Sequence, residues 1–104
     1  MSADNWTFDT FATWLTVKSE AFRADGFIIE LQRHDGPRSS IRLKAERSAR
    51  VGELTVWDDG MASEAVIDLQ VGDFVHMRDG TQLSGDWESQ LAPFFDETTK
   101  GGAT

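Results

Sequence analysis

The spacing of apolar residues changes from helical to strand-like at Gly26, and this change limits the folds that the chain can adopt. Before Gly26, four large apolar side chains recur at the intervals of an amphipathic helix: Phe8, Phe11, Leu15 and Phe22. We therefore predict one helix over about residues 7–25, with Thr7 as its N-cap and Asp25-Gly26 as its C-terminal stop.

After Gly26, apolar and polar residues alternate with a period of two, which is typical of strands that bury one face. The alternation predicts five strands, at about residues 27–32, 41–46, 51–58, 61–69 and 74–77. Turn residues separate them, with Asp59-Gly60 as a strong hairpin signal and Asp79-Gly80 as the expected exit of the last strand. The glycines at positions 52, 60, 72 and 80 follow the turn rhythm of an antiparallel meander.

A second helix is predicted to begin near Ser84 or Asp86. Its large apolar side chains lie on one side: Trp87, Leu91, Phe94 and Phe95. Pro93 has no N–H and its ring clashes with the preceding turn, so we expect a kink or two short helical pieces. Residues 98–104 offer nothing to bury, and we expect them to be a disordered tail that follows a single domain over residues 1–97.

These elements predict an α+β fold, in which the N-terminal helix packs on a four- to five-stranded antiparallel meander sheet with a C-terminal helical segment. A chain of 104 residues can bury about two-thirds of its unfolded surface, so it can fold without disulfides. The absence of cysteine excludes disulfides, thiolate metal sites and cysteine nucleophiles. With no basic, apolar leader and no long apolar run, the chain is expected to be cytoplasmic and to bind no membrane.

Acidic residues are concentrated in the second half of the chain. The net charge of −8 divides into seven acids and eight bases in residues 1–50, against eleven acids and two bases in residues 51–104. Each phosphate contact needs a cation, so this half disfavours nucleic acid and favours a basic protein partner. The basic residues between Arg33 and Arg50 have no interleaved aromatics for stacking on bases, and they are more typical of a solvated strand face.

Motifs for catalysis are missing from the sequence. His34 and His76 are the only histidines, and no zinc-protease, nucleophile-elbow, phosphate-loop or dinucleotide motif occurs. Carboxylates such as Asp58 and Asp68 could in principle act as an acid and a base, but nothing specifies a pocket for them. We therefore predict a protein that is not an enzyme and that has no cofactor and no metal.

Trp57 is the candidate anchor for a protein partner. Because Leu54 and Val56 continue the inward pattern of their strand, Trp57 is predicted to face away from the core. It could simply pack on neighbouring strands or on the second helix, or it could be a binding hot spot. An acidic rim that would attract a basic partner is predicted around it: Asp58, Asp59, Glu64, Asp68, Asp73 and Asp79.

Several short segments between about Phe8 and Phe95 resemble the TriTu immunity family. The most specific is residues 54–60 (Leu-Thr-Val-Trp-Asp-Asp-Gly), followed by residues 65–68 (Ala-Val-Ile-Asp); residues 11–15 (Phe-Ala-Thr-Trp-Leu) also agree. The resemblance carries three positions over to this chain: Trp57, Asp68 and Gly60, the last with a structural role.

The resemblance implies a cytosolic antitoxin of a bacterial polymorphic-toxin system. Its expected partner is a cognate TreTu effector, an ADP-ribosyltransferase that uses NAD to modify the elongation factor EF-Tu. The implied mechanism is a 1:1 complex that denies NAD or EF-Tu access to the toxin. Two other classes stay open: a non-catalytic adaptor or chaperone for a secreted effector, and an ADP-ribose hydrolase, which is disfavoured because no acidic metal-binding motif occurs.

Overall fold

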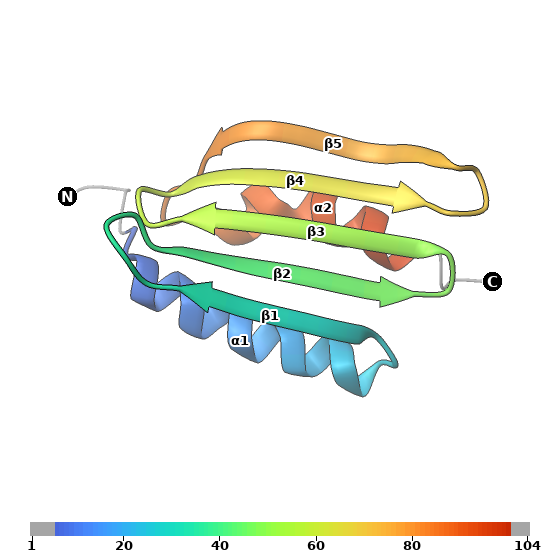
Figure 1. The fold of residues 1–104 in the computed structure, drawn as a ribbon, viewed down its shortest axis with the longest axis horizontal. Coiled ribbons are helices and arrows are strands. Elements are labelled where there is room, and N and C mark those ends of the chain that lie inside the picture. The colour runs from blue at the N-terminus through green and yellow to red at the C-terminus, as the bar shows by residue number, and fades with distance from the viewer. Residues whose placement is uncertain (1–5, 101–104) are drawn as a thin grey trace.

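The computed structural model describes residues 6–100. They form a five-stranded antiparallel sheet in the order β1-β2-β3-β4-β5, with one helix before it and one after it (Figure 1). The elements are α1 (Phe8–Ala24), β1 (Ile28–His34), β2 (Ser40–Arg47), β3 (Arg50–Trp57), β4 (Met61–Asp68), β5 (Asp73–Gln82) and α2 (Trp87–Lys100). The predicted α+β meander fold is confirmed.

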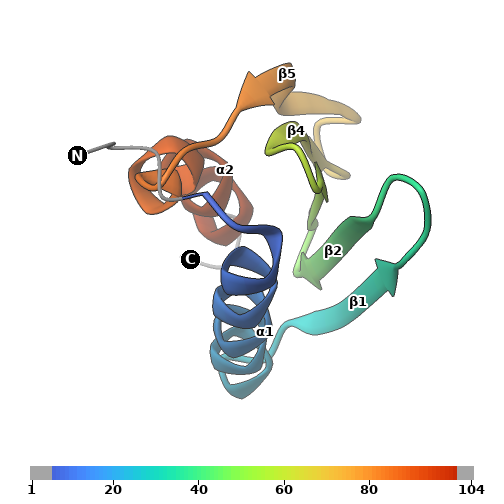
Figure 2. The same ribbon diagram turned by 90° about the vertical axis from the view of Figure 1, so that its left-hand side faces the viewer.

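Both helices lie on the same face of the sheet, which we call the covered face (Figure 2). Helix α1 packs mainly on β1 and β2, and α2 packs on β2 to β5. The strands alternate as predicted: Leu43, Leu54 and Val66 are fully buried on the covered face, and their neighbours point to the other side. We call that other side the open face.

Helix α1 begins and ends where the sequence predicts. The Thr7 hydroxyl accepts a hydrogen bond from the backbone N–H of Thr10 at 3.2 Å, which satisfies one of the free donors of the first turn. Asp25 follows the last helical residue, and Gly26 then takes a φ of +92°, which a residue with a Cβ adopts only at a cost.

Strand β5 is longer than predicted, and Asp79-Gly80 is not its exit. Asp79 pairs with Ser63 and Thr81 pairs with Ala62, so Gly80, with a φ of +81°, is an unpaired bulge residue within the strand. A second register shift skips Val75. A glycine with a positive φ occurs in β-bulges as well as in turns, so the Asp-Gly motif alone does not distinguish a bulge from a turn.

Helix α2 runs without a break from Trp87 to Lys100, so the prediction of two short helical pieces at Pro93 is wrong. The carbonyl that loses its donor belongs to Ser89, four residues earlier. Ser89 and Pro93 are both exposed, so water can satisfy that carbonyl. On the opposite side of the helix, Leu91 and Phe94 are fully buried, and this packing holds both halves of the helix against the sheet.

The helix also includes residues 98–100, which we predicted to belong to a disordered tail. Thr98 is only 1% exposed, and its hydroxyl donates to the carbonyl of Phe94 at 2.8 Å, so a polar side chain is buried without an unmet hydrogen bond. It sits against Gly52 of β3, where a Cβ would lie 2.5 Å from Thr98 Oγ1. The rest of the predicted tail, residues 101–104, lies outside the described residues.

The two helices meet through large aromatic side chains rather than through close backbone approach. The Trp14 ring lies 6.1 Å from that of Trp87 and 6.0 Å from that of Phe95, and Phe11 lies 5.8 Å from Trp87, all with edge-on geometry. These contacts fill the space between the helices over the sheet. Neither helix is long and apolar enough to cross a membrane.

Candidate partner-binding surface

Trp57 lies on the open face, as the alternation predicts. It is the last residue of β3, directly after the buried Val56, and its side chain is half-buried. Its cover comes from the loop between β1 and β2, because the guanidinium of Arg38 lies 4.9 Å from the centre of the indole ring. Trp57 and Arg38 therefore form one stacked unit at one end of the open face.

Asp58 and Asp59 form hydrogen bonds and an ion pair that hold the loops around Trp57 together. A carboxylate oxygen of Asp58 accepts from the backbone N–H of Ser39 at 2.9 Å, which ties the β1–β2 loop to the β3–β4 turn. Asp59 accepts from the N–H of Met61 at 3.0 Å and pairs with Arg38 at 3.4 Å. The Asp59 side chain keeps 53% of its exposure, so it can still meet a partner.

Glu64 is not on an exposed rim, and that part of the prediction is wrong. Its side chain is fully buried on the covered face, between β4, β5 and α2. One carboxylate oxygen accepts from Nη2 of Arg78 at 2.8 Å, and the other lies 3.0 Å from Nε2 of His76. A carboxylate at this depth is stable because charged and polar partners surround it.

Asp68 also belongs to the covered face, so its predicted place on the rim is wrong as well. Its carboxylate accepts from Nε of Arg50 at 2.9 Å and from the N–H groups of Gln70 and Val71 in the following turn. The hydrogen bond from Arg50 is the main cause that lowers the pKa of Asp68 below its usual value, and the turn N–H groups add to it. Arg50 also contacts the side chain and carbonyl of Glu97, so Asp68 helps to anchor the end of α2.

Asp73 and Asp79 are exposed on β5, in agreement with a role at a surface. Asp79 is at the same end of the sheet as Trp57, because it pairs with Ser63, and Ser63 pairs with Thr55, two residues before Trp57. Asp73 is at the other end. Asp73 pairs with Asp68 at the far end of β4, six residues from Ala62, the register partner of Val56. Six residues of strand span about 20 Å. The predicted rim is therefore divided between two ends of the sheet and the covered face.

Sequence reasoning missed four exposed apolar residues near the turn between β4 and β5: Leu69, Val71, Phe74 and Met77. Alternation assigns one of every two residues of a strand to the core, and Phe74 and Met77, three residues apart, cannot both face outward in a regular strand. The bulge at Val75 allows it. Only the excess of large apolar residues in a turn, at Leu69 and Val71, could have pointed to this corner.

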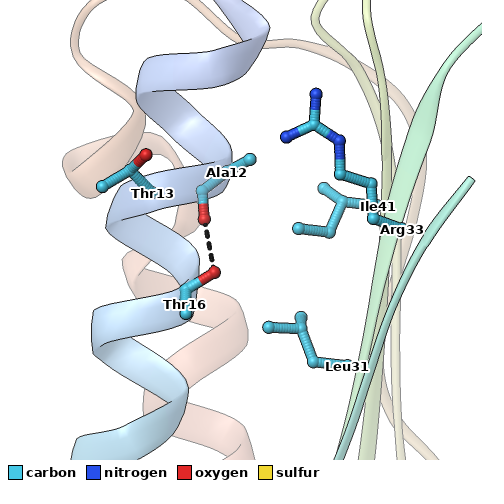
Figure 3. A pocket seen from close by; sticks show the side chains of 6 residues that line it. All are labelled: Ala12, Thr13, Thr16, Leu31, Arg33 and Ile41. Carbon is cyan, nitrogen blue, oxygen red and sulfur yellow. Dashed lines mark hydrogen bonds between the residues drawn. The ribbon is translucent and has the colours of Figure 1, made fainter. Parts of the chain in front are cut away.

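The space between α1 and the edge of the sheet contains a small hollow (Figure 3). It has a volume of about 200 Å³, below the roughly 300 Å³ at which ligand pockets begin. Two of its polar side chains already have partners. The Thr16 hydroxyl donates to the carbonyl of Ala12 at 2.8 Å (Figure 3), and Arg33 pairs with Asp9 and Asp35. Within residues 6–100, no three His, Asp or Glu side chains are grouped so that they could hold a metal ion.

Comparison with known proteins gives one match. A family model described as Immunity protein TriTu matches residues 9–97, which is most of the chain. No curated protein matches, and no solved structure matches. The matched region extends from the first turn of α1 to Glu97 in α2, and it includes both sides of the sheet.

Proposed function

Because the chain belongs to the TriTu immunity protein family, we propose that it is an antitoxin whose cognate toxin is an ADP-ribosyltransferase directed at EF-Tu. The family match over residues 9–97 is the observation that carries this proposal. The antitoxin works in the cytoplasm of the producing cell, where EF-Tu is found, and it needs no cofactor.

Neutralisation is stoichiometric in this proposal. One immunity protein binds one toxin domain and blocks the entry of NAD or of EF-Tu. The open face supports a binding mechanism because it is a preformed surface of paired strands. With eight residues along β3 and five strands across, it measures about 26 Å by about 19 Å. That is about two-thirds of the roughly 800 Å² that each partner buries in a standard interface, so the adjoining turns complete it.

The charge available to a partner is mainly negative. Seven of the ten basic side chains form ion pairs within the protein: Arg23, Arg33, Arg38, Arg42, Arg50, Arg78 and Lys100. Their cations are therefore largely neutralised, while the net charge of the chain is −8. A basic toxin surface would be steered toward such a protein, and its association rate would depend on salt.

Four of the predicted contact residues keep a place at this interface: Trp57, Asp59, Asp73 and Asp79. Asp58 supports them from the β3–β4 turn, where its carboxylate holds the loop that carries Arg38. Glu64 and Asp68 act inside the protein, by fixing β5 and α2 to the sheet. The contact residues therefore lie at both ends of the sheet.

The test is co-expression with the toxin domain encoded beside this gene. The proposal predicts that cells expressing both proteins grow, that cells expressing the toxin alone stop growing, and that the two proteins purify as a 1:1 complex. Toxicity that persists despite expression of this protein would contradict the proposal. Rescue without a complex would also contradict it, and association without rescue would favour an adaptor or chaperone.

A further inference from the structure

Five apolar residues belong to the end of β4, the following turn and the first part of β5, and this turn lies at one end of the sheet (Figure 1). We call this group the apolar corner: Ile67, Leu69, Val71, Phe74 and Met77. Phe74 pairs in register with Ile67, and Met77 pairs with Ala65, two residues earlier on the same face of β4. Side chains that are opposite in register lie about 5 Å apart and diagonal neighbours about 7–8 Å apart, so Ile67, Phe74 and Met77 are neighbours across the two strands. Leu69 and Val71 belong to the turn beside them.

Most of the exposed large apolar side chains of the described residues belong to the apolar corner. Four of the six exposed large apolar side chains among residues 6–100 belong to it, with 57% exposure at Leu69, 69% at Val71, 51% at Phe74 and 62% at Met77. Exposed apolar residues scattered singly are normal, but a contiguous group on a monomer commonly marks an interaction site.

The fold itself does not require these side chains to be large or apolar. The bulge at Val75 turns Phe74 and Met77 to the open side, while Val75 packs against the core and His76 reaches the buried carboxylate of Glu64. A bulge that re-aims side chains in an edge strand is a feature commonly tied to function. The core beneath is complete without the corner.

The charges around the apolar corner are negative and uncompensated. Asp79 lies two residues from Met77 on the open face of β5, is exposed, and forms no ion pair within the described part of the chain. Asp73 is also exposed and without an ion pair there, but it is in register with Asp68 and so lies on the covered side, at the end of β5 next to Phe74. The two arginines of this region, Arg50 and Arg78, point to the covered face, where Asp68 and Glu64 hold them. A partner that fits here therefore presents apolar side chains flanked by lysine or arginine.

We propose that the apolar corner is the anchor of the complex with the cognate toxin. A basic patch of the toxin places an apolar side chain between Phe74 and Met77, and its cations meet Asp79 on the open face and Asp73 at the end of β5. This inference rests on the proposed antitoxin function and adds to it which residues contribute most of the affinity for the toxin. Trp57 lies about 20 Å away along the strands, within the span of one standard interface.

Affinity measurements on the full chain with the purified toxin domain test the inference. We expect the double variant Phe74→Glu/Met77→Glu to bind at least about 100-fold more weakly, because it removes two central apolar contacts and requires two carboxylates to lose their hydration against an apolar side chain of the toxin. The matched control is Val17→Glu. Val17 is 66% exposed on α1, which covers the opposite face of the sheet, so this variant should bind within about threefold of the unchanged protein.

A second measurement removes any dependence on the folding of the variants. Hydrogen exchange of the unchanged protein should slow at residues 67–79 when the toxin binds. Unchanged affinity of the double variant, or unchanged exchange at residues 67–79 in a complex that does form, would overturn the apolar corner as the anchor and leave the antitoxin function standing. Failure of the unchanged protein to bind the toxin would overturn the proposed function itself.

Discussion

Arg78 on β5 holds the buried carboxylate of Glu64 on β4 with two hydrogen bonds, from Nη2 at 2.8 Å and from Nε at 3.0 Å. The same Nη2 donates to the carbonyl of Gln90 in α2 at 2.6 Å. One guanidinium therefore joins two strands and the second helix. The Glu64 side chain has no exposure to water, so hydrogen bonds from these partners replace the hydration of its carboxylate.

Removing the guanidinium by Arg78→Ala should lower the free energy of unfolding by about 3 kcal/mol. Breaking a buried ion pair costs about 3–5 kcal/mol because the remaining charge is left unpaired. The lower end applies because the Arg78 side chain is 39% exposed and water can reach the site. Urea denaturation measures the change. Arg42→Ala is the control, since it breaks the exposed Arg42–Glu53 pair and should cost under about 1 kcal/mol; equal losses in the two variants would refute the role assigned to Arg78.

The contact between Gly52 and Thr98 predicts that Gly52→Ala destabilises the protein by about 1–3 kcal/mol. The new Cβ would lie 2.5 Å from Thr98 Oγ1 and 3.1 Å from the Phe94 ring, so α2 would have to move away from β3. Thr98→Ala should recover part of the loss in the double variant, because it removes the closer of the two obstacles. Thermal unfolding of both single variants and the double variant measures this coupling. Strictly additive effects would argue against the contact.

Stability should fall in acid partly through Asp68. Its hydrogen bond from Arg50 lowers the pKa in the folded protein, and the pKa of Glu97 is lowered in the same direction, first by its hydrogen bond from Lys100. A group whose pKa is lower when folded stabilises fully above its unfolded value, near pH 4, and loses that contribution as the pH falls through the folded value. Denaturation between pH 6 and pH 2 should show a shallower decline for Asp68→Asn. An unchanged decline would mean that Asp68 does not contribute.

The stacked pair of Trp57 and Arg38 leads to a prediction about binding. Trp57→Ala should weaken binding to the toxin by about tenfold or more, because the substitution removes a large aromatic contact and frees Arg38 from its place. Trp57→Phe is the matched control, since it keeps an aromatic face beneath Arg38. Surface plasmon resonance with the toxin domain gives both affinities. Equal binding by Trp57→Ala and the unchanged protein would remove Trp57 from the interface.

The fold could be predicted from the sequence largely because one physical rule governs most of it. Strands with one buried face alternate, and Leu43, Leu54 and Val66 obey that rule on the covered face. The errors at Gly80 and Pro93 share a cause. Gly80 is expected to end a strand, but pairing between β4 and β5 continues past it. Pro93 is expected to break a helix, but packing of α2 on the sheet compensates for the lost hydrogen bond. Such compensation is tertiary and leaves no trace in a short motif.

The candidate surface was harder to predict than the fold. The outward direction of Trp57 follows from alternation, but the contact with Arg38 depends on the path of a loop. From sequence alone, a glutamate such as Glu64 is predicted to be exposed, because charged side chains are seldom buried without a partner. The partner, Arg78, comes from another strand, and only the structure shows that the two meet. The outward turn of Phe74 and Met77 depends on a bulge, and the register of β4 and β5 is needed to see it.

The most direct test of stoichiometric neutralisation is a titration of toxin activity. Purified toxin domain, NAD and EF-Tu are mixed with increasing amounts of this protein, and transfer of ADP-ribose to EF-Tu is measured. The account predicts a linear fall in activity that reaches zero at one equivalent of the protein, with ADP-ribose already on EF-Tu left in place. Full activity at several equivalents, or removal of ADP-ribose by small amounts of the protein, would contradict it.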